Sequence, residues 1–363
     1  MARYNIYHRK DGRWEGRISQ EMQDNGKRKY HYIYAKTPRE VIQKIESIIA
    51  NENSMKCHKS FSILFSEWSN SVCHRIKEST YANYQMKAKK HILPCFGEIS
   101  VDFLESKDIN SFIQRKIQEG LSVRYITDII ILMKTVFKYA VRMYHILNPM
   151  ENIVMPKKKT SEITLLDDAE QVILKKYIQD HHNTTTLGTA LAITTGIRIG
   201  ELCALQWCDI DLEKRILTVR KTMQRIQCKN GTSKTKLIIT DPKSEASRRR
   251  IPIPDCMMGF LSEFKASSDN YVLSGLLKPV EPRTMQYRFR SILKNVNLPS
   301  VHFHALRHCF ASRCISLGFD VKALSELLGH SSVEITLNRY VHSSFEQKRD
   351  YMNRIEMYPF AKD

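Results

Sequence analysis

The sequence predicts a multidomain protein: a small α+β domain with a three-stranded sheet and one helix, an all-α domain of four helices, and a mainly α domain with a small antiparallel sheet. Three observations predict this fold class. Strand-like alternation ends near residue 34, helical apolar spacing fills residues 60–153, and alternating stretches return within residues 215–253 between further helices. Polar stretches without periodicity separate these parts. We therefore expect domains at residues 1–55, 58–155 and 160–363.

The first domain should begin with a small sheet. Asp11-Gly12 and Asn25-Gly26 are dipeptides that tolerate the positive φ of tight hairpin turns. They separate three expected strands, Arg3–Tyr7, Arg13–Ser19 and Lys27–Tyr34. Thr37 can cap a following helix and Glu40 can complete a capping box, so we expect that helix to run to about Ala50. Basic side chains crowd the strands, which fits either a DNA-binding face or an ordinary charged surface.

Helical spacing predicts the second domain. Helices are expected around Ile63, Phe65 and Trp68, and over Tyr81–Ile92, Asp108–Glu119 and Val123–Met143. The longest carries a broad apolar stripe that should be buried, formed by Ile126, Ile129, Ile130, Met133, Val136, Phe137 and Ala140. Lys87, Lys89 and Lys90 lie in one basic stretch, which either contacts phosphates or is a solvated helix face.

The third domain should be mainly helical. Helices are expected at Asp167–Gln179, Thr185–Thr194, Gly200–Gln206, Met257–Lys265, Arg283–Val296, His304–Leu317, Val321–Leu328, Val333–Tyr340 and Ser344–Arg354. Alternation at residues 215–227, 236–241 and 248–253 is typical of a small antiparallel sheet. Lys243 would lie in the turn before the last strand of that sheet.

The charge of the chain favours a polyanionic partner. The 57 Lys and Arg outnumber the 38 Asp and Glu, which gives a net charge of +19. Cations on phosphates release condensed counterions, so we expect double-stranded DNA as the partner. Nine cysteines without paired spacing are expected to be reduced thiols. With no apolar run near the ~20 residues of a membrane span and no secretory signal, we expect a cytoplasmic protein with no membrane partner.

Tyr340 and two arginines form the core of a candidate catalytic set. A phosphodiester is an anion that resists attack, and a phenol with a pKa of about 10 is a weak nucleophile at neutral pH. Attack by Tyr340 therefore needs cations that are fixed on the non-bridging oxygens before reaction. Arg198 and Arg307 can supply two planar guanidinium groups that stay charged and bind two oxygens each.

Four further residues can support this chemistry. His304 precedes Arg307 by three residues on an expected helix, so both project from one face. His330 adds another donor. Lys243 can protonate the 5′ oxygen as it leaves. Glu201 follows Arg198 by about one helical turn and can hold its guanidinium in place.

Each of these residues has a simpler interpretation when taken alone. A single Arg or Glu on a helix is usually a surface residue, and one of 16 tyrosines is most often a packing residue. His302, His304 and His308 could suggest a metal site, but no carboxylate or cysteine completes a zinc set, so we expect no metal. Only the joint arrangement favours catalysis.

In the order of its motifs, the C-terminal half resembles the tyrosine recombinase (phage integrase) family. The matching segments are TGIRIGEL at 195–202, Lys243, HALRH at 304–308, LGH at 328–330 and Tyr340. The four-helix domain is similar to the core-site DNA-binding domain of that family. The first domain resembles the arm-type DNA-binding domain of integrases from conjugative transposons and temperate phages.

This resemblance implies a mechanism and an assembly. Tyr340 would be the nucleophile that forms a 3′-phosphotyrosyl bond, and the other catalytic residues would be Arg198, Lys243, His304, Arg307 and His330, supported by Glu201. Religation would need no cofactor, metal or ATP. The protein would act as a homotetramer on attachment, crossover and arm sites, integrating and excising a mobile element, a transposon or a prophage, in the bacterial nucleoid. An excisionase or a DNA-bending protein would be a further partner, and residues 344–363 would pack on a neighbouring subunit.

Two other functions stay open on the sequence. A type IB topoisomerase shares this chemistry but relaxes DNA as a monomer, and the separate N-terminal domain and extended C-terminus argue against it. A DNA-binding regulator could keep a catalytically silent version of the fold. The intact set of seven residues argues against that alternative, because loss of activity would let some of them change.

Overall fold

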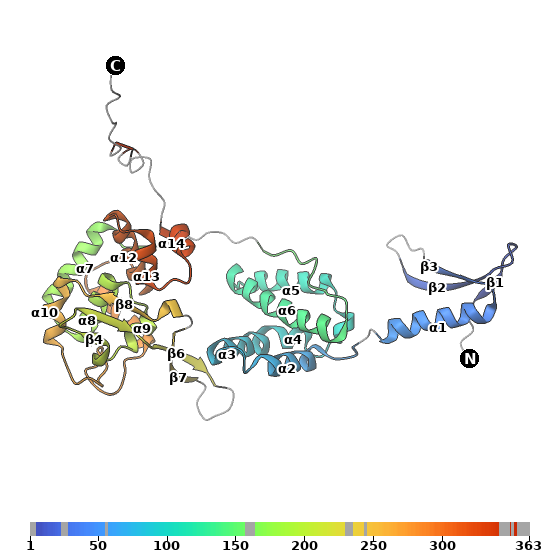
Figure 1. The fold of residues 1–363 in the computed structure, drawn as a ribbon, viewed down its shortest axis with the longest axis horizontal. Coiled ribbons are helices and arrows are strands. Elements are labelled where there is room, and N and C mark those ends of the chain that lie inside the picture. Colours follow the sequence, from blue (N-terminus) through green and yellow to red (C-terminus); the bar gives the residue numbers. More distant parts are fainter. Residues whose placement is uncertain are drawn as a thin grey trace, which may run out of the picture. The chain divides into compact units, whose positions relative to one another are not determined.

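A computed structural model describes residues 5–22, 28–54, 57–156, 164–228, 235–242, 245–340, 349 and 352–353, without the side chains of 19–22, 28–29, 48–54 and 338–340. The chain divides into two compact units, Met1–Lys159 and Thr160–Asp363 (Figure 1). Within the first unit, the N-terminal sheet and the helical part have separate apolar cores. The predicted fold class is confirmed: a three-stranded sheet with a helix, an all-α part, and a mainly α part with small sheets.

The N-terminal sheet is antiparallel with strand order β1-β2-β3. Its strands are β1 (Ile6–His8), β2 (Trp14–Met22) and β3 (Arg28–Ala35), followed by helix α1 (Pro38–Ser54). Helix α1 covers one face of the sheet, where Val41 and Ile45 pack against Ile33 and Ala35. A Cβ atom at Gly16 would lie 2.5 Å from Val41, so glycine in β2 permits this close approach of the helix.

The end of α1 differs from the prediction. We expected the helix to stop near Ala50 and a linker to follow, but the helix continues to Ser54. No proline or glycine occurs between these positions, so nothing in the backbone chemistry stops the helix. At the other end the predicted cap is present, because the Thr37 hydroxyl accepts a hydrogen bond from the Glu40 amide at 3.3 Å.

The helical part of the first unit is built around one long helix. Its elements are α2 (Phe61–Val72), α3 (Glu78–Lys87), α4 (Leu93–Phe96), α5 (Ser106–Gln118) and α6 (Val123–Tyr144). All seven residues of the predicted α6 stripe are buried, which confirms the helical spacing. The helix expected around Ile63 is present as α2, although Ile63 itself is exposed. Lys87, in contrast, is not on an exposed face: it is buried and pairs with Asp128 at 3.1 Å. Lys89 and Lys90 are exposed, as expected.

A turn of π-helix joins α3 to α4 and contains a buried histidine. The turn spans Ala88–Ile92, and His91 within it is buried, with its ring 5.4 Å from that of Tyr125. The Nε2 atom of His91 has no hydrogen-bond partner among the described residues. Burial, and then the nearby Lys116 and Lys90 charges, lower the pKa of His91 from its ordinary value, while Glu119 opposes them weakly.

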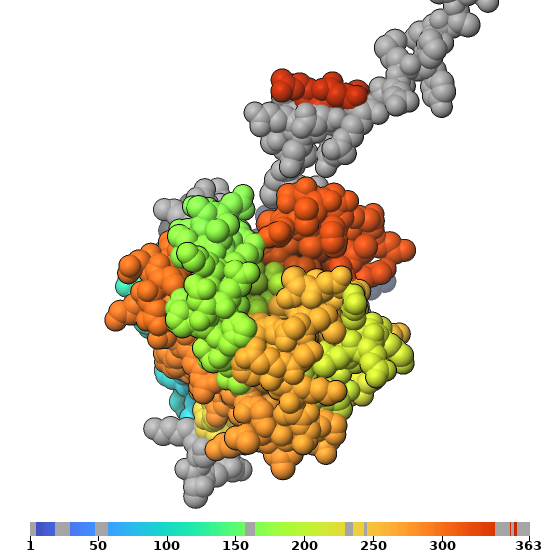
Figure 2. Space-filling model, turned by 90° about the vertical axis from the view of Figure 1, so that its left-hand side faces the viewer, coloured from blue at the N-terminus to red at the C-terminus, as the bar shows by residue number. Residues whose placement is uncertain are grey.

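The second unit is mainly helical. Its helices are α7 (Asp168–Asp180), α8 (Thr184–Thr195), α9 (Ile199–Cys203), α10 (Met258–Glu263), α11 (Pro282–Asn295), α12 (His304–Ser316), α13 (Val321–Leu328) and α14 (Val333–Tyr340). Helices α13 and α14 have the predicted bounds, and Figure 2 shows the space-filling surface of this unit. Helix α9 is shorter than predicted, because Trp207 instead hydrogen-bonds through its amide to Asn270.

The strands of this unit form two sheets where we predicted one. The first sheet has the order β4-β5-β8, with β4 (Ile210–Asp211), β5 (Ile216–Val219) and β8 (Arg249–Pro252). The second is the antiparallel hairpin of β6 (Thr222–Gln227) and β7 (Thr235–Thr240). The alternating stretch 215–227 therefore breaks between β5 and β6, and each half takes a different partner.

Several predicted features lie outside the described residues. These are the turn at Asn25-Gly26, residues 157–160 of the second linker, Lys243, and most of the helix expected at Ser344–Arg354. In the described part of the chain, no helix has the length and apolar character needed to span a membrane.

The buried His91 predicts a pH dependence of the helical part. Because the pKa of His91 is lowered on folding, the unfolded chain takes up a proton below pH 6.5 before the folded chain does. The free energy of unfolding should therefore fall as the pH drops from 6.5, by up to about 1.4 kcal/mol per pH unit. Substitution His91→Phe should remove this dependence in urea unfolding experiments at pH 7.0 and 5.5.

The control is His74→Phe, since His74 is exposed and belongs to the same helical part. It should keep the pH dependence of the unmodified protein. Equal slopes for His91→Phe and the unmodified protein would show that protonation of His91 is not coupled to folding.

Candidate active site

Three arginines converge on the C-terminal end of α13. The Nε atom of Arg249 donates to the carbonyl of Leu327 at 2.6 Å, and Nη2 of Arg307 donates to that of Leu328 at 2.6 Å. Nη2 of Arg198 donates to the next carbonyl, of Gly329, at 3.0 Å. The last carbonyls of a helix lack intrahelical partners and carry partial negative charge. Three successive carbonyls thus hold three guanidinium groups at one place.

A buried carboxylate joins two of these arginines. Glu201 is 4% exposed, and its oxygens accept hydrogen bonds from Arg249 at 2.8 and 3.1 Å and from Arg198 at 2.8 Å. Burial by itself would raise the pKa of Glu201, but the charges and hydrogen bonds of Arg249 and Arg198 outweigh it and lower the pKa. Glu201 also caps α9, since it accepts the Arg198 amide at 3.0 Å. Glu201 thus contacts both the guanidinium and the amide of Arg198.

Arg307 is fixed from two sides by backbone. It is only 2% exposed, and Nη1 donates to the carbonyl of Gly196 at 2.7 Å while Nη2 donates to Leu328. Gly196 ends α8, so Arg307 ties the end of α8 to the end of α13. Because the two contacts lie on different terminal nitrogens, together they fix the plane of the guanidinium group. Each of these nitrogens carries two N–H groups.

Two histidines flank the arginines. His304 is the exposed first residue of α12, one turn before Arg307, and its ring packs edge-on against buried His308 at 5.0 Å. His330 follows Gly329 and shares a 2.8 Å hydrogen bond between Nδ1 and the buried hydroxyl of Thr336. This contact orients the His330 ring from α14, the helix that ends at Tyr340.

Gly329 allows this turn between α13 and α14. Its φ is +63°, and a Cβ there would lie 2.9 Å from the Ala246 carbonyl oxygen and 2.9 Å from Cδ of Arg249. A larger residue would therefore strain the backbone and displace Arg249. The LGH motif places its glycine where both the conformation and the space require it.

The structure brings some of the candidate catalytic residues together and describes others only in part. Arg198, Glu201, Arg307 and His330 meet at the end of α13, and His304 lies one turn from Arg307. Two predicted residues cannot be compared in the same way. Lys243 lies outside the described residues, and of Tyr340 only the backbone, as the last residue of α14, is described.

The sequence interpretation missed Arg249. It is 8% exposed, on β8, and pairs with Glu201 across 48 residues of chain. The signal was present in the run Arg248-Arg249-Arg250, because strand residues alternate between two faces and the middle arginine must point opposite to its neighbours. The observed alternation of β8, with Arg249 buried and Arg250 exposed, fits this rule.

A basic hollow lies beside this network. Its volume is about 470 Å³, and Arg220, Lys221, Arg248 and Arg250 contribute cations to its lining. Asp241 is the carboxylate of this lining, and it pairs with Arg248 at 2.9 Å. Asp241 precedes Lys243 by two residues in the sequence. The excess of cations gives the hollow the charge that suits a phosphate backbone.

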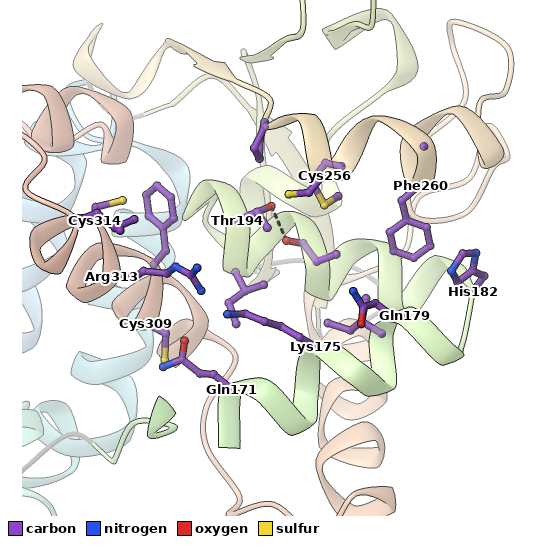
Figure 3. A pocket seen from close by; sticks show the side chains of 18 of the residues that line it. Gln171, Lys175, Gln179, His182, Thr194, Cys256, Phe260, Cys309, Arg313 and Cys314 are labelled. Carbon is purple, nitrogen blue, oxygen red and sulfur yellow. Dashed lines mark hydrogen bonds between the residues drawn. The ribbon is translucent and has the colours of Figure 1, made fainter. Parts of the chain in front are cut away.

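A separate cavity of about 700 Å³ contains none of the candidate catalytic residues. Residues of α7, α8, α10 and α12 contribute to its lining. Figure 3 shows Lys175 and Arg313 on one side of the cavity and Phe260 and His182 on another. Most of its lining is apolar, so its chemistry differs from that of the arginine network. Within the described part of the chain, no group of three or more His, Cys, Asp or Glu is placed to hold a metal ion.

Comparison with known proteins agrees with this fold. Residues 152–347 match the family described as the phage integrase family, and residues 60–117 match the phage integrase N-terminal SAM-like domain. A tyrosine recombinase XerC-like protein of Caldanaerobacter subterraneus subsp. tengcongensis is 30% identical over 300 residues, which cover 75% of this chain and 76% of the relative.

Two solved structures share the fold. The Tn1549 transposon integrase, in complex with transposon right end DNA, has a TM-score of 0.68 at 23% identity and covers 82% of this chain and 99% of its own. A lambda integrase tetramer bound to a Holliday junction has a TM-score of 0.59 at 20% identity, with coverage of 94% and 98%. The chain belongs to the phage integrase family and is therefore a tyrosine recombinase, an enzyme that cleaves and rejoins DNA.

The Glu201–Arg249 pair predicts a large loss of stability when it is broken. Substitution Arg249→Met leaves Glu201 buried without its main partner, which typically costs about 3–5 kcal/mol. The matched control is Arg250→Met on the same strand, where the side chain is exposed and the change should stay within about 0.5 kcal/mol. Hydrogen exchange of the β8 and α13 amides in increasing urea measures both. Equal effects of the two substitutions would contradict this role of the buried pair.

Proposed function

We propose that this chain is a site-specific integrase that cuts and rejoins DNA through a 3′-phosphotyrosyl intermediate and thereby integrates and excises a mobile genetic element. One observation carries the proposal. Arg198 and Arg307, which come from segments more than a hundred residues apart, donate to successive carbonyls just before His330 and the helix that ends at Tyr340. A phosphate held there would be close to the helix that bears the nucleophile.

The proposed chemistry assigns one task to each group. The Tyr340 oxygen attacks the phosphorus, the P–O bond to the 5′ oxygen breaks, and Lys243 supplies the proton that this leaving oxygen needs. Arg198 and Arg307 stabilise the negative charge on the non-bridging oxygens, because preorganised donors need no rearrangement during reaction. The histidines, His304 and His330, complete the set of donors. The phosphotyrosyl ester keeps the energy of the broken bond, so a 5′-hydroxyl can reverse the reaction without a cofactor.

The other two parts of the chain are proposed to choose the DNA. The helical part, which matches the N-terminal SAM-like domain of phage integrases, would bind the crossover site, with exposed Lys89 and Lys90 available for phosphate contacts. The N-terminal domain would bind arm-type sites through the sheet face that α1 leaves open. Tyr7, Tyr32 and Tyr34 are exposed there beside arginine side chains. The major groove of DNA admits β-strands, and some DNA-binding proteins read base edges there with strands.

The relatives support the biological part of the proposal. The Tn1549 integrase belongs to a transposon and was solved with transposon end DNA, and lambda integrase forms a tetramer on a Holliday junction. We propose the same kind of role for this chain: a homotetramer that joins two DNA segments by sequential strand exchange at attachment sites of a mobile element. An excisionase or a DNA-bending protein would act as a partner that sets the direction of the reaction.

The covalent step has a direct test. Duplexes that span the junctions of the element carrying this gene, with a nick near the expected crossover, should give protein–DNA adducts that resist SDS. Tyr340→Phe should abolish these adducts, because no oxygen is left to form the ester, while Tyr271→Phe in the same unit should leave them unchanged. Denaturing gels of labelled DNA report both results.

Other outcomes point to other functions. Supercoil relaxation without recombinant products would favour a type IB topoisomerase. DNA binding without any adduct in the unmodified protein would favour a catalytically silent regulator and would contradict the integrase.

The proposed tetramer predicts a separate role for the C-terminal segment. A chain that ends at His342 keeps the candidate catalytic residues but lacks residues 344–363, which are expected to pack on a neighbouring subunit. Assembly on paired sites should be reduced while binding to a single site stays the same. Mobility-shift assays with one-site and two-site duplexes separate these effects. Unchanged assembly would remove the segment from the proposed interface.

A further inference from the structure

The open face of the N-terminal sheet combines arginines and tyrosines around one buried carboxylate. In the register of the sheet, Glu15 of β2 lies opposite Tyr7 of β1 and Tyr34 of β3. Arg17 lies two residues farther along β2, on the same face, opposite Tyr32. Helix α1 covers the other face, so Glu15 is at the centre of the face that the helix leaves open.

Glu15 holds two arginines at once. Its Oε2 accepts a hydrogen bond from Nη1 of Arg9 at 2.7 Å, and its Oε1 accepts one from Nε of Arg17 at 2.9 Å. Each guanidinium has five N–H groups, so each keeps most of its hydrogen-bonding capacity beyond this contact. The arginine side chains are 42% exposed, whereas the Glu15 side chain is 6% exposed. The carboxylate therefore lies beneath the cations that it holds.

The tyrosine rings fix the same arginines from the sides. The guanidinium of Arg17 lies 4.9 Å from the ring centre of Tyr7 and 5.3 Å from that of Tyr32. That of Arg9 lies 5.3 Å from the ring of Tyr34. Cation–π contacts of this kind are directional and keep the plane of the guanidinium defined. Arg17 is thus held by one carboxylate and two aromatic rings, and Arg9 by Glu15, by Asp11 at 3.4 Å and by one ring.

A carboxylate at this place has a cost for a surface that binds a polyanion. It cancels one positive charge, and its negative charge repels phosphates. Burial beneath Arg9 and Arg17 prevents Glu15 from reaching a base edge as an acceptor. The hydrogen bonds of Arg17 and Arg9 oppose the effect of burial and keep the pKa of Glu15 below its ordinary value, so the residue is charged at neutral pH. Its contribution must come through the arginines.

We infer that Glu15 is a specificity-determining positioning residue, which presents Arg9 and Arg17 as a preset pair of forks to guanine edges in the major groove of the arm-type site. The inference rests on the proposed binding of arm DNA by this domain. Arginine binds O6 and N7 of guanine with two parallel hydrogen bonds, and such a contact tolerates little error in the angle of the fork. Glu15 lowers non-specific attraction and raises discrimination between sequences.

The test compares the affinity for a specific duplex with the affinity for a shuffled one. A change in charge alters both affinities alike, whereas a change in arginine positioning alters only the specific one. The full chain carrying Tyr340→Phe, which binds without cleaving, selects duplexes from a pool with 20 randomised base pairs. Sequences that are lost when Arg9→Ala and Arg17→Ala are added define the arm-type site. Dissociation constants are then measured for the selected duplex and for a shuffled duplex of equal composition.

Glu15→Gln should leave binding to the shuffled duplex equal or tighter, because one negative charge is removed. The specificity ratio, which is the dissociation constant for the shuffled duplex divided by that for the selected duplex, should fall by about 5- to 150-fold. This is the range expected for losing one bidentate base contact. Glu46→Gln removes the same charge from exposed α1 and should leave the ratio unchanged. An equal gain for both duplexes with Glu15→Gln, and no change in their ratio, would overturn the inference.

A second substitution guards against misfolding at Glu15. Arg17→Lys keeps the net charge and leaves Glu15 untouched, but it removes the Nε contact and the fork. The ratio should fall, and adding Glu15→Gln should then lower it by a smaller factor than in the chain with Arg17 intact, since the Glu15–Arg17 contact is already lost and only Arg9 is left to release. An unchanged ratio with Arg17→Lys would also overturn the inference. If the chain with Arg9→Ala and Arg17→Ala selects the same sequences as the chain with both arginines, the proposed arm-binding role fails, and the inference fails with it.

Discussion

The catalytic unit depends on three helix-end carbonyls that are held by three arginines. Leu327, Leu328 and Gly329 accept hydrogen bonds from side chains on β8, α12 and the start of α9. These carbonyls would otherwise lack intrahelical partners, and Arg249 and Arg307 would be buried charges without these acceptors. Each group therefore satisfies the other. The buried Glu201 offsets part of this positive charge, because its single carboxylate pairs with both Arg198 and Arg249 and links β8 to the start of α9.

This arrangement holds the guanidinium groups in fixed orientations, which suits the proposed binding of a phosphate. A guanidinium that must find its orientation during reaction loses part of its electrostatic effect, whereas one fixed in advance does not. Arg307, nearly buried and tied to Gly196 and Leu328, cannot reorient without disturbing two helix ends. The N-terminal sheet uses the same principle at its surface, where Glu15 and the tyrosines orient two arginines. In both places a carboxylate reduces net charge and increases order.

Much of the fold follows from local patterns in the sequence. Helices α13 and α14 have the predicted bounds, and the α6 stripe is buried, because apolar spacing reports which face a helix must cover. The failures have physical causes as well. The π-helical turn at Ala88–Ile92 lies where Ala88 and Ile92 join the buried core, and the apolar spacing of the sequence did not predict it. The division into two sheets depends on strand partners far along the chain, which alternation alone does not identify.

The sequence by itself determined the order and kind of the chemical groups. Arg198, Glu201, His304, Arg307 and His330 could be named as a candidate set, because their residue types suit a phosphate and the order of their motifs resembles that of the tyrosine recombinase family. Only the tertiary structure decided which groups they meet. Arg249 as the partner of Glu201, and the carbonyl of Gly329 as the acceptor of Arg198, are separated from them by 48 and 131 residues. Contacts across such distances are set by the packing of helix ends and strands, and no local pattern records them.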